Sequence, residues 1–458
     1  MKILLVQPPS GSSFSDKVFL HEPLALEYLG AGLRMDGHDV RLHDARLDPD
    51  VESVLAEFEP RIVGLTGYTI QVPVICSLAD RIKSLRPGTT IVVGGHHATV
   101  RPGDFNRDSV AVIVIGEGVT TMREIARCLD SGDNLKDIQG LALPGTEMRF
   151  TDPRPYPPLD ELPFPDRSLT APYRSHYFSE WLKPIASIRT SLGCTARCNF
   201  CALWEITGGR YLRRKTELVV EELKTIEEKN VFFCDDESMC DARRMDHLAD
   251  LIREAGIEKR YFLYSRGDTI VKHPDVFAKW RDIGLHLVFV GMETFSPERL
   301  SRMDKGLSIE DQEKAAGILE DLGVIMYASF MVDPDFTHAD FAALRDYVRR
   351  LKLRHASYSI LTPLPGTRMY EERADQMLPY QPELFDFLHT ALPTTLPLSE
   401  FYAEFAGLYE KAIPRHRAFR TLALYGMKRI PEVLKLIPEA INKLKSHHLD
   451  HRNEAWTP

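Results

Sequence analysis

The sequence predicts an α/β protein built on two successive parallel sheets. Two observations predict this class. Strand and helix signals alternate over residues 1–145 and, after an interruption, again over residues 184–395. The predicted strands Thr90–Gly95 and Val110–Ile115 are almost continuously apolar, which is typical of parallel strands buried on both faces. We therefore expect a doubly wound sheet first and a separate sheet after it.

Length, composition and charge indicate a globular protein and exclude several other classes of protein. The chain has 458 residues, which suggests about three domains at roughly 150 residues each. Hydrophobic residues make up 44% and charged residues 27%, which are ordinary values for a globular protein. The net charge of −9 argues against nucleic acid as a partner. No signal-peptide pattern opens the sequence and no apolar run reaches the roughly 18 residues of a spanning helix, so we expect a cytoplasmic protein.

The first region is predicted to be a flavodoxin-like (Rossmann-like) sheet. Its five strands are Lys2–Val6, Val40–His43, Ile62–Thr66, Thr90–Gly95 and Val110–Ile115. Sheets of this kind bind ligands at the carboxyl ends of their strands. The loops at those ends are Gln7–Ser12, Gly67–Thr69, Gly94–Thr99 and Gly116–Gly118. Such a site could hold flavin, a nucleotide or cobalamin.

A proline-rich stretch follows the first region. Eight prolines between residues 144 and 172 exclude helix and central strand, so residues 146–183 are predicted to form an extended linker. Six further strands are then predicted at Ile185–Thr190, Val231–Asp235, Tyr261–Ser265, Leu287–Glu293, Ile325–Val332 and Ala356–Thr362. Six βα units are too few for a closed eight-unit barrel. We expect an open, partial barrel with its chemistry at the C-terminal strand ends.

Residues 396–458 are predicted to be helical. An apolar stripe at helical spacing consists of Ile430, Val433, Leu434, Ile437, Ile441 and Leu444. A basic excess accompanies it, from Arg415, Arg417, Arg420, Lys428, Arg429, Lys435, Lys443 and Lys445. Basic amphipathic helices lie in membrane interfaces, so peripheral membrane contact is expected here. The alternative is that the stripe packs on the barrel.

Three of the seven cysteines, Cys194, Cys198 and Cys201, follow the first barrel strand. Clustered cysteines in a chain without an export signal indicate metal ligands. Three thiolates on a [4Fe–4S] cluster would leave one iron open for a bidentate ligand that carries an amine and a carboxylate. The alternatives are a zinc site completed by Cys234 and Cys240, or a cluster completed by a distant cysteine.

The CxxxCxxC spacing after a barrel strand resembles the radical S-adenosylmethionine (SAM) superfamily, over about residues 184–370. The resemblance implies a [4Fe–4S] cluster on the three cysteines and SAM at the strand ends. The residues that it places around SAM are Phe200, Asp235, Asp236, Ser265, Arg266 and Glu293. The Asp-Asp pair departs from the GGE form of the family's motif. The alternatives are a helix cap for the aspartates, a surface ion pair for Arg266 and a solvated acid for Glu293.

The first region resembles the cobalamin-binding domain of cobalamin-dependent radical SAM enzymes. No GxGxxG or Walker A loop is present, and glycine-rich strand ends take their place. The resemblance implies that cobalamin is bound by Gly67, Tyr68, Gly94, Gly95, His96, His97, Gly116, Glu117 and Gly118. The DxHxxG motif that carries a lower axial histidine is absent. We therefore expect no protein ligand below the cobalt, and ordinary loop roles for both histidines.

These resemblances imply a fold and a reaction. They imply a cobalamin-binding domain over 1–145, a linker over 146–183, a partial (β/α)6 radical SAM domain over 184–395 and a helical region over 396–458. The implied reaction is methylation of an unactivated carbon with two SAM per turnover, one for the 5′-deoxyadenosyl radical and one to remethylate cobalamin. An electron donor such as flavodoxin or ferredoxin is implied as partner.

The substrate class is suggested by a narrower resemblance. Several stretches resemble the hopanoid C-3 methylase subgroup: Lys17–Asp44, Val231–Met245, His273–Leu285 with Val288–Phe295, and Tyr327–Leu353. They imply an apolar hopanoid that is methylated at C-3 of its A ring. One alternative is a related enzyme with another substrate, such as a tetrapyrrole cyclase-like enzyme or a natural-product methylase. The other is a corrinoid and iron–sulfur redox sensor that is not an enzyme.

Overall fold

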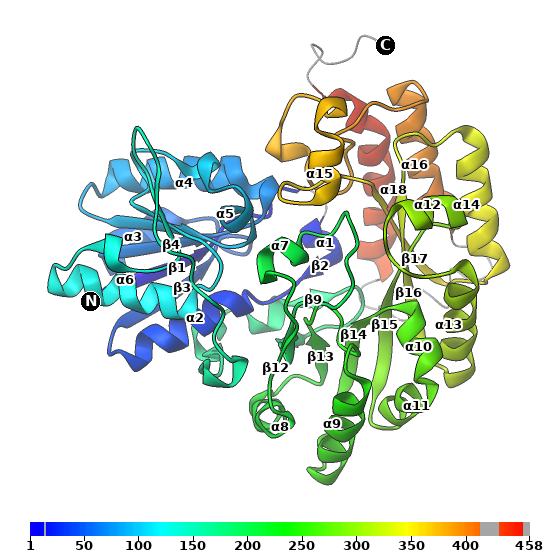
Figure 1. Ribbon diagram of the computed structural model, residues 1–458, viewed down its shortest axis with the longest axis horizontal. Coiled ribbons are helices and arrows are strands. Elements are labelled where there is room, and N and C mark those ends of the chain that lie inside the picture. Colours follow the sequence, from blue (N-terminus) through cyan, green and yellow to red (C-terminus); the bar gives the residue numbers. More distant parts are fainter. Residues whose placement is uncertain (13–14, 413–429, 452–458) are drawn as a thin grey trace. The chain divides into compact units, whose positions relative to one another are not determined.

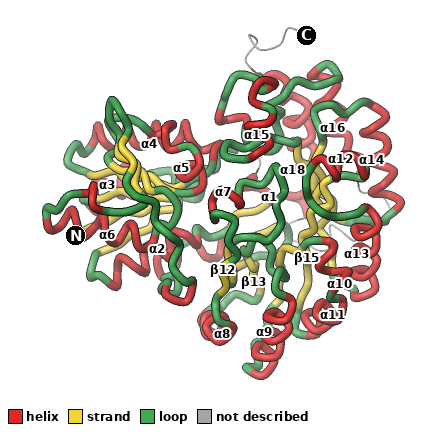
Figure 2. The backbone as a smooth tube through the Cα atoms, in the orientation of Figure 1, coloured by secondary structure: helices red, strands yellow, loops and turns green. Residues whose placement is uncertain are grey.

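Figure 1 shows a computed structural model of the protein, which describes residues 1–12, 15–412 and 430–451. The chain divides into two compact units. The N-terminal unit comprises Met1–Tyr177 and Ala202–Lys215, and the barrel unit comprises Phe178–Cys201 and Thr216–Pro458. In each unit, strands lie inside a layer of helices (Figure 2). Both predicted sheets are present, so the α/β class is confirmed.

The N-terminal unit contains a seven-stranded sheet in the order β3-β1-β4-β5-β6-β7-β8. Its strands are β1 (Lys2–Gln7), β3 (Asp39–Asp44), β4 (Ile62–Thr66), β5 (Thr90–Gly94), β6 (Val112–Val114), β7 (Leu141–Leu143) and β8 (Arg149–Phe150). The first five are parallel, and their order is that of a flavodoxin-like sheet. The last two strands are antiparallel and were not predicted, because strands of three and two residues carry little periodicity.

Helices cover both faces of this sheet. The elements outside it are α1 (Ser15–Val18), β2 (Phe19–Leu20), α2 (Leu24–Met35), α3 (Val51–Phe58), α4 (Val72–Leu85), α5 (His96–Val100) and α6 (Val119–Ser131). One buried core lies under α3 and α4, and another lies under α2 and α6. Neighbouring residues of β1, such as Leu4 and Leu5, enter opposite cores. Burial on both faces explains the continuous apolar runs in the sequence.

The proline-rich segment packs on the N-terminal unit as far as Tyr177. It forms short 3-10 turns at Leu159–Glu161, Arg167–Thr170 and Arg174–His176. Leu169 joins the core under α2 and α6, and the Tyr177 hydroxyl donates to Asp44 Oδ2 over 3.1 Å. The division of the chain at residues 145, 183 and 395 stays a prediction.

The barrel unit contains six parallel strands in the order β10-β13-β14-β15-β16-β17. They are β10 (Ile185–Ile188), β13 (Asn230–Phe233), β14 (Arg260–Ser265), β15 (Leu285–Glu293), β16 (Ile325–Val332) and β17 (His355–Ile360). All six correspond to predicted strands. Chain order equals spatial order and β10 does not pair with β17, so the sheet is an open, partial barrel over the described residues.

Helices cover the outer face of the barrel sheet. They are α8 (Thr216–Thr225), α9 (Ala242–Glu254), α10 (Gly267–Lys272), α11 (Pro274–Asp282), α13 (Ile309–Leu322) and α14 (His338–Arg350). Two short helices, α12 (Pro297–Arg302) and α15 (Arg368–Glu372), follow β15 and β17. Four further short elements are β9 (Phe178–Ser179) and β11 (Ser191–Leu192) in this unit, with α7 (Leu203–Thr207) and β12 (Leu212–Arg213) in the N-terminal unit. In β16, buried residues alternate with half-buried residues.

The C-terminal region forms α16 (Leu398–Ala412) and α18 (Ile430–Ser446), as predicted. Val433 and Leu444 of the apolar stripe are buried, whereas Leu434 is 54% and Ile437 43% exposed. Part of the apolar stripe is therefore buried in the protein, and part of it is exposed. The predicted basic residues Arg415, Arg417, Arg420, Lys428 and Arg429 lie outside the described residues. Among the described helices, none combines the length and apolar composition needed to cross a bilayer.

Candidate functional site

The loop that carries Cys194, Cys198 and Cys201 is anchored from several sides. Its three cysteines are half-buried and form no disulfide. The backbone N–H of Asn199 donates to Met303 O over 3.2 Å, and its carbonyl accepts from Met369 N over 3.0 Å. The buried Asn199 Oδ1 has no hydrogen-bond partner among the described residues. The loop is held in place by contacts that do not involve the cysteine thiols.

Two aspartates at the end of β13 fix the start of this loop. Asp235 is 1% exposed, and its carboxylate accepts from the backbone N–H and hydroxyl of Thr190, both over 2.6 Å, and from Ser191 N over 2.9 Å. Asp236 Oδ2 accepts from Gly193 N over 2.6 Å, directly before Cys194. Burial raises the pKa of both carboxyls. Both aspartates tie β13 to the segment that leads from β10 to the cysteines.

Charged groups at the ends of β14 and β15 surround the thiols. Arg266 donates to Asp268 Oδ1 over 3.0 Å and to Lys305 O over 2.7 Å. Lys305 is 7% exposed and pairs with Glu293, a residue with φ of 60° beside an irregularity in the β15–β16 pairing. Such a conformation in a non-glycine residue is typical of functional sites. Ser265 Oγ donates to the buried Glu237 over 3.2 Å.

Burial of the loop disfavours free thiolates, and nearby cations oppose this effect in part. Burial raises the pKa of Cys194 to about 11, and it also raises the pKa of Cys198. Lys305 and Arg266 oppose the rise at Cys198 because they favour the thiolate. A bound metal removes the thiol protons outright. Three half-buried thiols within eight residues, beside two cations, therefore fit a [4Fe–4S] cluster with one open iron.

The predicted SAM residues lie at or near adjoining strand ends. Several of them already form hydrogen bonds or ion pairs with other residues of the protein. All three hydrogen bonds of Asp235 go to Thr190 and Ser191, and Glu293 faces Lys305. Phe200 is half-buried on the cysteine loop. The roles of these residues toward SAM stay predictions. Sequence reasoning missed Glu237, Lys305 and Asn199, although Glu237 directly follows the Asp-Asp pair.

In the N-terminal unit, the glycine-rich loops meet at one edge because β4, β5 and β6 are parallel. A Cβ on Gly95, whose φ is +100°, would lie 2.5 Å from Thr66 Oγ1 and 3.0 Å from Gly67 N. Only glycine fits this close approach. A Cβ on Gly116 would meet no atom within 4 Å, so the backbone there is open to a ligand. Gly94 and Gly118 lie at the same edge.

The four larger predicted cobalamin residues divide into two pairs. His97 is buried, with Nδ1 3.0 Å from Thr69 Oγ1 and Nε2 2.9 Å from Asp104 Oδ2. Glu117 is also buried and caps α6 by accepting from Thr120 N over 3.0 Å. The rings of Tyr68 and His96 are instead exposed, with centroids 4.9 Å apart. An open backbone edge beside exposed rings fits the flat corrin, and His97 retains no nitrogen for cobalt.

Comparison with known proteins finds a family match in each of the two regions. The B12 binding domain family matches residues 18–126, and the Radical SAM superfamily matches residues 188–348. The chain is 32% identical to the hopanoid C-3 methylase of Methylococcus capsulatus, over 93% of this chain and 84% of that protein.

Two solved structures share the fold. The cobalamin-dependent SAM radical enzyme OxsB, with aqua-cobalamin and SAM bound, gives a TM-score of 0.74 at 16% identity, over 98% of this chain and 72% of OxsB. The radical SAM methyltransferase TsrM from Kitasatospora setae gives 0.66 at 20% identity, over 82% of this chain and 76% of TsrM. The chain therefore belongs to the cobalamin-dependent radical SAM methyltransferases, enzymes that use cobalamin, SAM and a [4Fe–4S] cluster.

Proposed function

We propose that this enzyme methylates an unactivated carbon of a large, rigid, apolar substrate, namely C-3 of the hopanoid A ring, with two SAM per turnover. The relative at 32% identity over most of both chains is named for that reaction. The observation that carries the proposal is a row of aromatic side chains on the inner face of the barrel sheet.

This row, the aromatic face, consists of Phe232, Phe262, Tyr264, Phe289 and Tyr327. Successive ring centroids lie 4.7, 5.6, 4.9 and 5.6 Å apart from Phe232 to Tyr327. Such spacings are favourable for aromatic pairs. The five residues lie on β13, β14, β15 and β16, so the row crosses four neighbouring strands.

The aromatic face points away from the main core of the barrel unit. Its strand neighbours Tyr261, Leu263, Val288 and Val290 belong to that core, and successive residues of a strand point to opposite faces. Tyr264, Phe289 and Tyr327 remain half-buried rather than buried. The Tyr327 hydroxyl donates to Glu180 Oε1 over 2.8 Å, which satisfies its polar end. A broad aromatic wall with a paired hydroxyl favours a flat hydrocarbon over a charged substrate.

Different residues of the chain would bind the cluster, SAM and the substrate. Cys194, Cys198 and Cys201 would hold the cluster, Asp236 and Arg266 stand where SAM would be bound, and the aromatic face would hold the substrate. When bound, the cofactors supply the electron, the 5′-deoxyadenosyl radical and the methyl group. Exclusion of water by the aromatic face protects reactive species from side reactions.

The test is an anaerobic assay of the reconstituted enzyme with SAM, methylcobalamin, a reductant and a hopanoid that lacks the C-3 methyl group. We expect a product heavier by one CH2 on ring A, detected by mass spectrometry of the extracted lipid. A tetrapyrrole ester and free tryptophan serve as substrates of other classes. Methylation of either of these, with an unchanged hopanoid and normal formation of 5′-deoxyadenosine, would contradict the proposed substrate.

We further infer peripheral contact between α18 and a membrane, where such a substrate is located. Leu434 and Ile437 are exposed beside Lys435, whose side chain is 81% exposed. An apolar pair next to a cation suits an anionic lipid surface. Leu434→Ser with Ile437→Ser should weaken sedimentation with anionic liposomes and leave iron and cobalt contents unchanged. Equal sedimentation of variant and wild type would contradict the inference.

A further inference from the structure

Uncharged polar side chains continue the inner face of the barrel sheet beyond the aromatic face. In the pairing of β16 with β17, Tyr327 lies opposite His355, and Ser329 lies opposite Ser357. The alternate residues of both strands pack in or against the main core, namely Met326, Ala328, Ala356 and Tyr358. Because successive residues of a strand point to opposite faces, His355, Ser329 and Ser357 point to the inner face. We call these three residues the polar strip.

The polar strip carries hydrogen-bonding groups that the protein itself does not use. All three side chains are half-buried. In the part of the chain that the structure describes, neither the imidazole of His355 nor the hydroxyl of Ser329 or Ser357 forms a hydrogen bond within the protein. Ser359, on the same face, instead donates to Phe330 O over 3.4 Å. Polar groups that are withdrawn from bulk water without a partner in the protein need water or a ligand as partner.

The hydrogen-bonding groups of the polar strip are uncharged. Burial, together with the nearby Arg354 and His286, lowers the pKa of His355 to about 4. A neutral imidazole offers one N–H donor and one acceptor nitrogen, and a serine hydroxyl also donates and accepts. Groups that both donate and accept, without a charge, match an alcohol. A carboxylate, a phosphate or an amine would instead require an opposite charge beside it.

The short turn before β10 packs against this face at the N-terminal ends of the strands. The ring centroid of Trp181 lies 4.7 Å from that of His355, and its Nε1 lies 3.5 Å from His286 Nε2. Glu180 Oε1 accepts from the Tyr327 hydroxyl over 2.8 Å. The turn therefore contacts β15, β16 and β17 at the end of the barrel opposite the cysteine loop, which follows the carboxyl end of β10.

The distance along β17 matches a long, rigid substrate. At about 3.3 Å per residue, His355 lies about 16 Å from Ile360 at the carboxyl end of the strand. A pentacyclic skeleton has a comparable length. If ring A lies at the strand ends that carry the cysteine loop, the opposite end of the skeleton therefore reaches the polar strip.

We infer that the polar strip binds a hydroxyl group of the substrate, at the end remote from the methylated ring. This inference rests on the proposed function and makes it narrower. The aromatic face holds the apolar rings, and His355, Ser329 and Ser357 select a hopanoid alcohol over a hopanoid hydrocarbon. A hydrocarbon would leave these groups without partners when it displaces their water, which lowers its affinity.

The test compares two hopanoids, one with a side-chain hydroxyl and one with hydrogen in its place. Each is incubated anaerobically with reconstituted holoenzyme, SAM, methylcobalamin and a reductant, and kcat/KM for methylation is measured by mass spectrometry. The wild type should favour the alcohol at least about fivefold, the effect of one hydrogen bond. Equal values would overturn this inference and leave the proposed function intact. Methylation of neither, with normal formation of 5′-deoxyadenosine, would overturn both.

Variants of the polar strip locate the source of the preference. His355→Phe keeps a ring but removes both nitrogens, so it should lower kcat/KM for the alcohol and not for the hydrocarbon. Ser357→Ala should act in the same direction. His247→Phe is the control, because His247 lies on α9 with a side chain that is 58% exposed, and it should keep the preference of the wild type. An unchanged preference in both strip variants, or an equal fall for both substrates, would overturn the inference.

Discussion

The two parallel sheets differ in how completely their strands are buried. Ile3–Val6 of β1 are all buried and divide between two cores, one on each side of the sheet. In β15 and β16, buried residues alternate with half-buried ones, and a single large core lies on one side. A sheet that is covered twice offers a ligand only its strand ends. The half-buried inner side of β15 and β16 offers a ligand a face in addition to the strand ends, which suits an enzyme that must hold both a cofactor and a bulky substrate.

The largest effect is expected at the strand ends of the barrel unit. Simultaneous substitution of Cys194, Cys198 and Cys201 by alanine should abolish the cluster absorbance and all formation of 5′-deoxyadenosine, because a [4Fe–4S] cluster cannot be held without thiolate ligands. Cobalt content should persist, since the N-terminal sheet has its own strand ends. Cys128→Ala, at a buried cysteine of α6, is the control for general damage. Full iron content in the triple variant would refute the assignment.

The second prediction concerns the half-buried inner side of β15. Phe289→Ala removes a half-buried ring from the aromatic face, so its cost in stability should stay below the about 3–5 kcal/mol of a core phenylalanine. Methylated product should fall at least about tenfold, which corresponds to about 1.4 kcal/mol of lost binding in the transition state. Cleavage of SAM to 5′-deoxyadenosine should continue, because the cysteine loop is untouched. Paired chromatographic assays of both products measure this uncoupling.

Two matched variants sharpen that result. Phe289→Leu keeps an apolar side chain on the aromatic face and should retain most of the methylation. Val288→Ala alters the neighbouring residue, which points into the core, and should lower Tm without uncoupling the two products. If Val288→Ala uncouples as strongly as Phe289→Ala, the inner face has no special role and the contrast between the sheets fails.

The third prediction concerns the edge of the N-terminal sheet. Gly95→Ala places a Cβ against Thr66 and Gly67 at a φ that alanine rarely adopts. A loss of about 1–3 kcal/mol in unfolding free energy is expected, together with a several-fold fall in bound cobalamin. Gly88→Ala is the control, because its Cβ would meet no atom within 4 Å. Cobalt content and denaturant unfolding measure the two effects, and unchanged cobalt in Gly95→Ala would exclude this edge as the site.

The sequence allowed the strands of both sheets to be predicted because their apolar runs and periods are local signals. The strands β7 and β8 were not predicted because they are short and pair antiparallel after turns. At the strand ends, the types of residue could be predicted from the sequence. The hydrogen-bond partners of their side chains could not. Asp235 lies where the motif places it, yet its hydrogen bonds join it to Thr190 and Ser191, a contact that depends on the pairing of β10 with β13.

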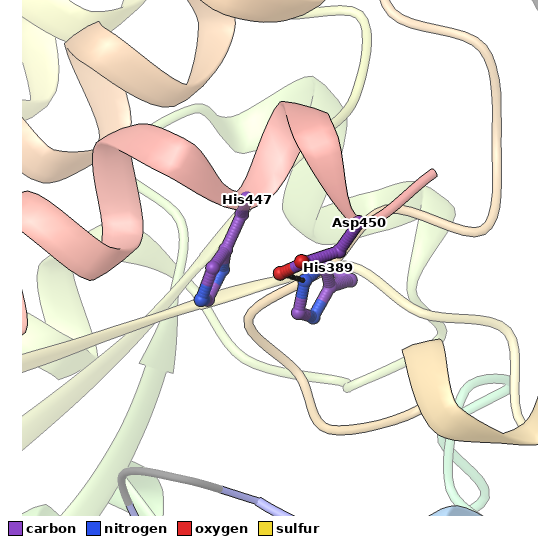
Figure 3. A group of neighbouring side chains, drawn as sticks. All are labelled: His389, His447 and Asp450. Atoms are coloured by element: carbon purple, nitrogen blue, oxygen red, sulfur yellow. Dashed lines mark hydrogen bonds and ion pairs between the residues drawn. The ribbon is translucent and has the colours of Figure 1, made fainter. Parts of the chain in front are cut away.

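Some residues reach a strand end from a distant part of the chain, and the sequence did not allow their positions to be predicted. Lys305 follows α12 and reaches the end of β15, where it pairs with Glu293. No local pattern marks it, because its position depends on the packing of α12 and the turn after it. His389 likewise lies next to His447 and Asp450 (Figure 3), which are 58 and 61 residues further along the chain. Local sequence patterns do not indicate contacts between residues so far apart.

The two units also differ in how they bury carboxyl groups. Asp235 of the barrel unit accepts three hydrogen bonds. Glu27 of the N-terminal unit is fully buried, accepts from the Thr170 hydroxyl, and leaves Oε2 without a partner in the part of the chain that the structure describes. Burial, together with the nearby Glu22, raises the pKa of Glu27 to about 8, although Arg167 and Arg174 oppose the rise. Burial therefore favours the protonated form of Glu27 in the folded protein.

The smallest expected effect follows from this protonation. Because the pKa of Glu27 is about 8 when folded and about 4.5 when unfolded, the native state binds more protons between these values. Stability should therefore fall as pH rises through that window, by at most about 1.4 kcal/mol per pH unit from this group. Glu27→Gln mimics the protonated form, so it should flatten the slope and be more stable than wild type at pH 9. Glu57→Gln alters an exposed carboxylate whose side chain is 72% accessible and should keep the slope of the wild type. Denaturant unfolding between pH 5 and 9 measures all three proteins, and parallel slopes for wild type and Glu27→Gln would show that Glu27 is ionised in the folded N-terminal unit.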